Sequence, residues 1–267
     1  MSSLRGNDLA LAMRLADAAD SITMARYQSI DLVVTTKPDD SPVTDADKAS
    51  EEAIRALLKS HRPDDGIVGE EFGDDAAGAE RYWVIDPIDG TKNFLRGVPT
   101  WATLIGLIEK QSDGSEVVVV GVVSAPALFR RWYASEGNGA FVSLNGGTPK
   151  RISVSQVSEI KDASISYSDF IGWDQRLAPF QELLESAWRT RGIGDFWSHM
   201  LVAEGAVDVA IEPKLAIWDM AALDIVVREA GGRFTNLDGT DGIHGGNGLS
   251  TNSALHATVV EALKVKG

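Results

Sequence analysis

The sequence predicts an α/β fold of the layered α+β type with two β-sheets, and three observations lead to this class. Apolar residues recur at helical spacing through most of the first 61 residues. β-rich runs then cluster up to about residue 150, and from residue 151 strands alternate with helices. We therefore expect two closely packed halves, residues 1–150 and 151–267, in one compact unit.

The elements of the first half follow from periodicity and turn signals. A helix is expected around residues 9–22, and a second at 44–61 follows the turn-rich segment KPDDSP. Short strands are expected at IVG and YWVID. Three β-rich runs follow, and the last ends in a hairpin signal, EGNG: they read WATLIGLIE, VVVVGVVS and RRWYAS.

The second half has a different pattern, in which strands and helices alternate. Gly231 and Gly232 stand where the C-terminal cap of a helix is expected. The chain also ends in a predicted helix. The other elements, in order, are strand ASISYS, helix LAPFQELLESAW, helix FWSHMLVAEGA, strand VDVAIEP, helix MAALDIVVREA, and strands GRFTNL and GLSTN.

Composition narrows the possible partners. The chain has 39 acidic and 25 basic side chains and a net charge of −14, which argues against nucleic acid and anionic membranes as partners. With no cysteine and four scattered histidines, a metal would be held by oxygen atoms. No apolar run approaches the roughly 20 residues of a membrane span, and the N-terminus lacks the pattern of a secretion signal. We expect a cytoplasmic protein.

The stretch YWVIDPIDGTKNF, residues 82–94, places two carboxylates at the end of an apolar strand. Asp86 and Asp89 would enter the crevice where α/β sheets bind ligands. Gly90 would let the backbone approach a ligand, and Thr91 would begin a helix whose free N–H groups favour an anion. Magnesium prefers such oxygen ligands and shares its shell with phosphate. Alternatively, the two aspartates form only a turn and a helix cap.

Three further acidic segments also stand at expected element boundaries. Glu70 follows a strand in GEE, Asp47 lies in VTDAD before a helix, and Asp219 precedes the apolar run of WDMAALDIVVREAGG. Each has an ordinary alternative: a solvated loop charge for Glu70, and helix capping for Asp47 and Asp219. Four acidic segments at element boundaries are less easily explained as independent coincidences.

Together the segments GEE (69–71), DPIDGTKNF (86–94) and WDMAALDIVVREAGG (218–232) resemble the signatures of the inositol monophosphatase superfamily of magnesium-dependent phosphatases. Their order and spacing also match, and the likeness runs from about residue 37 to 252. The resemblance implies an αβαβα sandwich with two sheets. It also implies two Mg²⁺ ions, with a third held more weakly. Glu70, Asp86 and the Ile88 carbonyl would hold one ion, and Asp86, Asp89 and Asp219 the second.

The resemblance also implies roles around these ions. Asp47 would lie near the third, weaker ion through water. The phosphate of a small phosphate ester would contact the N–H groups of Gly90 and Thr91. Glu70 and the Thr91 hydroxyl would orient and deprotonate the water that attacks phosphorus in line, while Lys37 resembles a basic residue near the same site. Most metal ligands thus fall in residues 1–150.

Within the superfamily, some positions differ from inositol-type enzymes. Arg96 stands where these usually have a histidine, and Leu223 where they have a glycine. Lys92 and the run RGIGDFWSHMLVAEGAVD resemble bacterial histidinol-phosphate phosphatases of histidine biosynthesis. We therefore expect histidinol phosphate as the substrate. An inositol-1-monophosphatase or a broad sugar-phosphate phosphatase is the alternative, and a non-catalytic, metal-dependent interaction protein with this fold is a third hypothesis.

Histidinol carries an ammonium group and an imidazole, so an acidic and aromatic pocket is expected. Asp195 and Glu212 would pair with the ammonium, since charge-assisted hydrogen bonds are the stronger kind. Phe196 and Trp197 would flank the imidazole, and the metal ligands Asp89 and Asp219 would also face the substrate. Core packing is the alternative for Phe196, and for the other aromatic residues that could close the pocket, Trp101 and Trp173. Asp195 could instead be a helix N-cap. The family resemblance also implies a homodimer.

Overall fold

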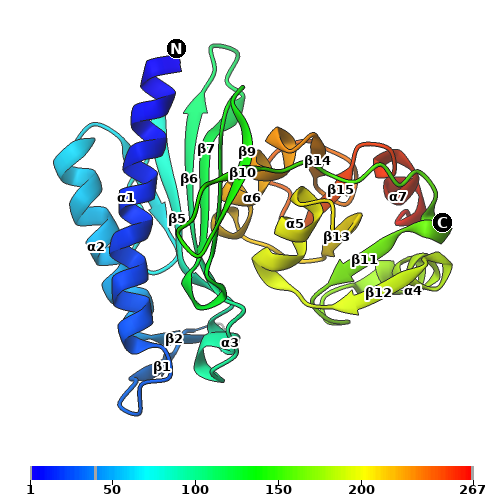
Figure 1. The fold of residues 1–267 in the computed structure, drawn as a ribbon, viewed down its shortest axis with the longest axis horizontal. Helices are drawn as coiled ribbons and strands as arrows, with labels where there is room; N and C mark the ends of the chain where they lie inside the picture. The colour runs from blue at the N-terminus through cyan, green and yellow to red at the C-terminus, as the bar shows by residue number, and fades with distance from the viewer. Residues whose placement is uncertain (1, 39–40, 266–267) are drawn as a thin grey trace.

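The computed structural model describes residues 2–38 and 41–265, which form five alternating layers of helix and sheet (Figure 1). Two helices cover the outer face of one sheet, two lie between the sheets, and two cover the outer face of the other sheet. In this order the helices are α1 (Ser2–Arg26), α2 (Asp45–His61), α5 (Asp195–Ala203), α6 (Ile217–Glu229), α4 (Leu177–Ser186) and α7 (His256–Ala262).

The larger sheet has eight strands in the order β10-β9-β8-β7-β6-β5-β3-β4. Its neighbouring strands are antiparallel except β3 and β5, which are parallel. The strands are β3 (Gly66–Gly69), β4 (Gly73–Asp74), β5 (Arg81–Asp89), β6 (Ala102–Lys110), β7 (Glu116–Ala125), β8 (Arg130–Ser135), β9 (Gly139–Leu144) and β10 (Lys150–Arg151).

The smaller sheet has five strands in the order β12-β11-β13-β15-β14. β11 runs parallel to both β12 and β13, and the remaining pairs are antiparallel. A separate two-stranded hairpin and the short helix α3 (Thr91–Leu95) lie beside the end of β5. The strands are β11 (Ser164–Tyr167), β12 (Arg189–Gly192), β13 (Val209–Glu212), β14 (Gly232–Thr235) and β15 (Gly248–Asn252), with β1 (Val34–Thr36) and β2 (Pro42–Thr44) in the hairpin.

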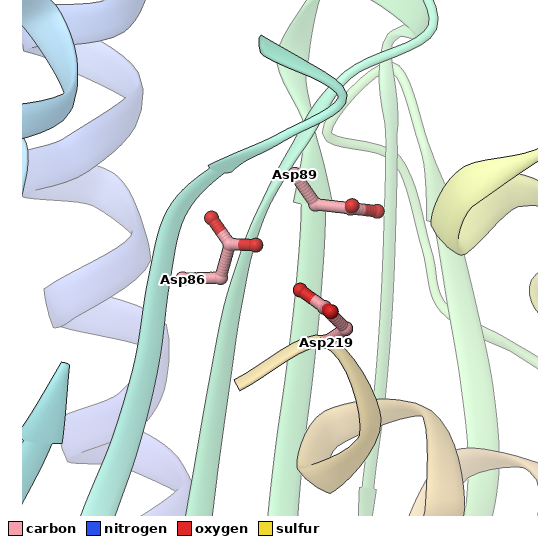
Figure 2. A group of neighbouring side chains, drawn as sticks. All are labelled: Asp86, Asp89 and Asp219. Carbon is pink, nitrogen blue, oxygen red and sulfur yellow. The ribbon is translucent and has the colours of Figure 1, made fainter. Parts of the chain in front are cut away.

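Helix α6 belongs to the second half of the chain but packs directly on the larger sheet. Two glycines make this close approach possible. A Cβ added at Gly106 of β6 would lie 2.7 Å from the Ala221 Cβ, and one at Gly121 of β7 would lie 2.5 Å from an Ile225 methyl carbon. Because such distances are shorter than carbon atoms tolerate, glycine is required at both positions. The contact places the first turn of α6 beside the end of β5 (Figure 2).

The two helices and five strands expected in the first half are present, and the expected hairpin at 136–139 joins β8 to β9. The sequence missed β12 because RTRG is a polar edge strand with no apolar alternation. Gly231 has φ +87° just after α6, as expected for a helix end. The division at residue 150 stays a prediction. Helix α6 follows this point in the sequence but packs on the larger sheet, which is formed mostly by residues before it. In the described residues, no helix is both long and apolar enough to cross a membrane.

Candidate active site

The C-terminal end of β5 brings Asp86 and Asp89 to one edge of the larger sheet. The register between β5 and β6 shifts between these two residues, so that their side chains leave the regular alternation of the strand. Oδ1 of Asp86 accepts a hydrogen bond from the Ile88 N–H at 2.9 Å, which is the turn expected as the ordinary alternative. Its other oxygen takes no part in that turn. The turn and a ligand role are therefore compatible.

Gly90 connects this strand end to helix α3. Its φ of +85° lies in the left-handed region, and a Cβ there would lie 2.9 Å from the Thr100 carbonyl oxygen. Glycine is therefore needed for both the conformation and the close approach. Thr91 then begins α3, as the sequence predicts.

Asp219 reaches the same place from the first turn of α6. Its Oδ2 accepts a hydrogen bond from the Ala216 N–H at 2.7 Å. Ala216 is the N-cap of α6, so the N-cap alternative for Asp219 is wrong, although its side chain bonds back to the cap residue from the third position of the helix. One oxygen atom from each of Asp86, Asp89 and Asp219 nevertheless lies within 4.8 Å of the others. Figure 2 shows the three carboxylates turned toward one another from β5 and α6.

Burial makes this cluster costly without a cation. It raises the pKa of Asp86 and Asp89 well above the ordinary value, and nearby carboxylates raise both further. After burial, Glu70 is the largest cause for Asp86. Burial likewise raises the pKa of Asp219 to about 6. Converging carboxylate oxygens with unfavourable charge are a donor set that fits a hard divalent cation.

Glu70 lies next to the cluster but is not one of its three members. Its Oε1 accepts a hydrogen bond from Lys37 Nζ at 2.7 Å, and the same ammonium is 2.6 Å from Glu71 Oε1. Burial lowers the pKa of Lys37, but the bonds to Glu70 and Glu71 outweigh it and raise the pKa. Lys37 is thus the cation that Glu70 contacts in this structure.

One carboxylate oxygen of Asp47 helps to cap helix α2, and the other has no hydrogen-bond partner among the described residues. Its Oδ2 accepts hydrogen bonds from Thr44 N at 2.8 Å and Thr44 Oγ1 at 2.5 Å, which completes a capping box at the start of α2. Its Oδ1 is buried and has no hydrogen-bond partner among the described residues. Burial raises its pKa to about 6, and Glu70 contributes to the shift. The capping alternative is correct, and one oxygen remains for a ligand.

Thr91 and Ile88 are in direct contact. Thr91 Oγ1 donates a hydrogen bond to the Ile88 carbonyl oxygen at 3.1 Å. The Ile88 side chain is fully buried in a small core with Phe94 and Trp101, so it fixes this carbonyl in place. Because the hydroxyl hydrogen is used in that bond, the oxygen of Thr91 is left as an acceptor.

Two adjoining cavities meet at these residues. The outer cavity, of about 660 Å³, is lined by Glu70, Gly90, Thr91 and Asp219 among others. The inner cavity, of about 300 Å³, extends between α5, α6 and the smaller sheet. Seven residues border both cavities: Lys92, Ser168, Asp169, Asp195, Lys214, Leu215 and Asp219. The inner cavity is lined by Asp89, Lys92, Ser168, Asp169, Ile171, Gly172, Asp195, Phe196, His199, Glu212, Pro213, Lys214, Leu215, Asp219 and Leu223.

Asp195 faces both cavities from the start of α5. The N-cap of this helix is Gly194, and no side chain caps it, so the N-cap alternative for Asp195 is wrong. Instead Asp195 has φ +51°, and its Oδ2 accepts a hydrogen bond from Asn93 Nδ2 at 3.0 Å. Burial raises its pKa to about 6, against the opposing effect of Lys92.

Glu212 ends strand β13 and is buried at the side of the inner cavity. Its Oε1 accepts a hydrogen bond from Ser168 Oγ at 2.7 Å. Burial raises the pKa of Glu212 to about 8, and the charges of Asp195 and Asp169 add to the shift. No cation pairs with Glu212 in the described part of the chain. Ser168 also accepts a bond from the Asp195 N–H at 3.3 Å.

Some of the aromatic residues line the inner cavity and others lie in the core. Phe196 belongs to both groups, because it lines the inner cavity and packs edge-on against Trp132 in the main core. Its N–H also donates to Asp89 Oδ2 at 2.7 Å. Trp197 lines neither cavity and packs against the main core, so the expectation that it flanks the substrate ring is wrong. Trp101 is fully buried beside Phe94, and Trp173 stacks on Phe180 at 3.5 Å, so core packing is correct for both tryptophans.

Sequence reasoning missed three side chains that complete the site. Ser168, Asn93 and His199 position or border the acidic groups. Ser168 and Asn93 have no pattern that distinguishes them from other polar residues of a strand end or a short helix. His199 lies four residues after Asp195 on α5, and this helical spacing was the available signal.

Comparison with known proteins identifies the relatives of this chain. Residues 7–266 match the inositol monophosphatase family. The chain belongs to this family. It is 54% identical to a histidinol-phosphatase of Mycobacterium tuberculosis (96% of this chain, 98% of the relative) and 55% identical to one of Streptomyces coelicolor (94% of each). These relatives confirm the predicted family and its reaction class, a phosphatase.

Solved structures of the family have the same fold. The extragenic suppressor protein suhB of Bartonella henselae superposes with a TM-score of 0.84 at 29% identity, covering 97% of this chain and 98% of that one. An IMPase of Thermotoga maritima also gives a TM-score of 0.84 at 29% identity, with 96% of each chain covered. The predicted layered fold is therefore confirmed.

Proposed function

We propose that this chain is a magnesium-dependent histidinol-phosphatase of histidine biosynthesis, which converts L-histidinol phosphate and water to L-histidinol and phosphate. The observation that carries the proposal is one continuous site with two acidic ends. The carboxylate cluster of Asp86, Asp89 and Asp219 suits the metal ions that a phosphate needs, and the buried Glu212 and Asp195 suit an ammonium group. The names of the two relatives more than 50% identical add support.

The metal ligands in this proposal are Glu70, Asp86, Asp89 and Asp219 with the Ile88 carbonyl, which would hold two Mg²⁺ ions. The open Oδ1 of Asp47 would take part in a weaker third site through water. When bound, the ions supply positive charge that offsets the phosphate and the charge of the transition state. Lys37 would have to leave Glu70, at least in part, when that carboxylate takes up an ion.

The chain itself would position the attacking water and the ester. The Thr91 oxygen is an acceptor because its hydrogen is bonded to the Ile88 carbonyl, so it can orient a water that donates to it. Glu70 would accept the proton of that water as oxygen attacks phosphorus in line. The N–H groups of Gly90 and Thr91 would hold phosphate oxygens at the start of α3.

The alcohol part of the substrate would occupy the inner cavity, where Glu212 and Asp195 would pair with its ammonium. An ammonium next to Glu212 would favour the ionised carboxylate and lower its pKa from about 8. Phe196 would contribute apolar contact from the wall of the same cavity. A neutral polyol phosphate would leave Glu212 without a cation, which makes an inositol phosphate the less suitable substrate.

A phosphate-release assay tests this proposal. Histidinol phosphate, inositol 1-phosphate and β-glycerophosphate are compared at saturating Mg²⁺ and after metal removal with EDTA. We expect release to require Mg²⁺ and kcat/KM to favour histidinol phosphate by about a hundredfold, the discrimination that unpaired buried polar groups readily provide. A hundredfold preference for inositol 1-phosphate would establish an inositol monophosphatase instead, and comparable rates on all three a broad phosphatase.

We also propose that the enzyme is a cytoplasmic homodimer, on the strength of the family resemblance. Light scattering of the purified chain at micromolar concentration tests the second part of this statement. A mass of about twice 28.6 kDa is expected, and a monomer mass would contradict it.

A further inference from the structure

The lining of the inner cavity is partly apolar. Leu215, Leu223 and Phe196 line it together with charged side chains that include Glu212 and Asp195. His199 is the one histidine among its lining residues. A cavity that combines apolar walls with a few polar atoms is the kind of site that recognises a ring with polar atoms at its edge.

His199 is held by one of its two ring nitrogens. Nδ1 lies 2.6 Å from Ser250 Oγ on β15, and the ring centre is 5.9 Å from that of Phe234. The side chain is 0% exposed, and Nε2 has no hydrogen-bond partner among the described residues. Burying a nitrogen without a partner is costly, so a ligand or water that bonds to it is favoured.

The charge state of His199 limits what it can bind. Burial lowers its pKa to about 3, so the ring is neutral at physiological pH. A neutral imidazole has one donor nitrogen and one acceptor nitrogen. If Ser250 donates to Nδ1, then Nε2 is a donor, and if Nδ1 donates to Ser250, then Nε2 is an acceptor.

We propose that Nε2 of His199 forms a hydrogen bond with the imidazole of the substrate and thereby selects a heteroaromatic alcohol phosphate. The inference rests on the proposed function and assigns a specificity residue to it. The substrate ring would lie on Leu215 and Leu223 while its ammonium meets Glu212 at the side. Because an imidazole offers both a donor and an acceptor, it can match either form of His199.

The test replaces the imidazole of His199 in the protein and, separately, the imidazole of the substrate by a benzene ring. Wild-type protein and His199→Phe are assayed with histidinol phosphate, with phenylalaninol phosphate, which has a benzene ring, and with O-phosphoethanolamine, which has no ring. We expect the wild type to prefer histidinol phosphate to phenylalaninol phosphate, and the variant to lose about tenfold of this preference, as one hydrogen bond would give. Activity on O-phosphoethanolamine should change by less than about twofold, because that substrate does not reach His199.

A matched control is His256→Phe, the same substitution at a buried histidine that borders neither cavity. It should leave the preference between the two ring substrates unchanged. An equal loss on all three substrates in His199→Phe would show that the residue serves only the structure. An unchanged ring preference would show that His199 does not touch the ring.

A second measurement needs no variant and applies if His199→Phe fails to fold. The two isomers of histidinol methylated at one ring nitrogen are compared with histidinol as inhibitors of the wild type. At least one isomer should bind about tenfold more weakly, and equal binding of all three would overturn the inference. If the wild type instead prefers inositol 1-phosphate to histidinol phosphate, the proposed function itself is wrong.

Discussion

The proposed metal end and the proposed substrate end of this site are both acidic, but different atoms hold their carboxylates. At the metal end, three main-chain N–H groups hold one oxygen each: those of Ile88, Phe196 and Ala216, bonded to Asp86, Asp89 and Asp219. At the substrate end, side chains do so, since Ser168 holds Glu212 and Asn93 holds Asp195.

This difference separates the two tasks of the enzyme. A main-chain N–H is present whatever the residue is, so the geometry of the metal end depends on the fold. A side-chain donor disappears with a single substitution, so the substrate end can change its specificity without disturbing the metal ligands. In the proposed function, the metal ligands are thus held by the backbone and the substrate contacts by a few side chains.

The largest effect should come from the metal end. Asp86→Asn keeps the size of the side chain but removes a charge that both proposed ions share. We expect kcat/KM to fall by at least about a thousandfold for every phosphate ester, because the ions contribute several kcal/mol to the transition state. Phosphate release and calorimetric Mg²⁺ titration of the same samples would measure the loss.

Asp64→Asn is the control for this variant, since Asp64 is exposed on a turn after α2. It should keep wild-type activity and Mg²⁺ binding. Full activity and normal Mg²⁺ binding of Asp86→Asn would contradict the proposal that Asp86 is a metal ligand.

A smaller and selective effect is expected at the substrate end. Glu212→Gln removes the charge beside the substrate ammonium and keeps a hydrogen-bond acceptor. For histidinol phosphate, kcat/KM should fall by about 10- to 100-fold, the range of a charge-assisted bond, while β-glycerophosphate should be affected by less than about threefold. Steady-state kinetics on both esters would measure the ratio.

Glu185→Gln on the exposed face of α4 is the matched control and should change neither ester. Equal losses on both esters in Glu212→Gln would mean that Glu212 supports the site as a whole. The distinction between the two ends would then be wrong.

The smallest effect concerns stability and pH. In the metal-free fold the pKa of Glu212 is about 8 and those of Asp195 and Asp219 are about 6, all above their ordinary values. The folded protein therefore binds protons that the unfolded chain has released, so the free energy of unfolding should decrease as the pH rises from about 5 to about 8. We expect Tm to fall by several degrees over this range in EDTA.

Magnesium should reverse much of this decrease, because it binds the ionised carboxylates at the metal end. The rise in Tm on adding Mg²⁺ should be larger at about pH 8 than at about pH 5. A Tm that is constant or rises with pH in EDTA would show that these carboxyl groups titrate normally. Differential scanning fluorimetry at fixed ionic strength would measure both series.

The sequence predicted most of the fold because its elements carry local signals. The apolar strand of β5 ends at Asp89, Gly90 breaks it and Thr91 begins a helix, and each step depends on neighbouring residues. Polar edge strands such as β12 lack such a signal, since they bury little apolar surface. The same locality explains why the sequence could not separate helix capping from metal binding. In both Asp47 and Asp219, one carboxylate oxygen bonds to the start of a helix, and the other oxygen is left for a proposed metal ion.

The sequence by itself determined the layered fold, the family and the acidic residues at the ends of its elements, because these follow from periodicity and short motifs. Only the tertiary structure decided which side chains meet. Close packing of α6 on Gly106 and Gly121 brings Asp219 to Asp86 and Asp89, and the ammonium of Lys37, from the β1–β2 hairpin, meets Glu70 after β3. Such contacts join residues far apart in the chain, and burial at that meeting point sets their pKa values.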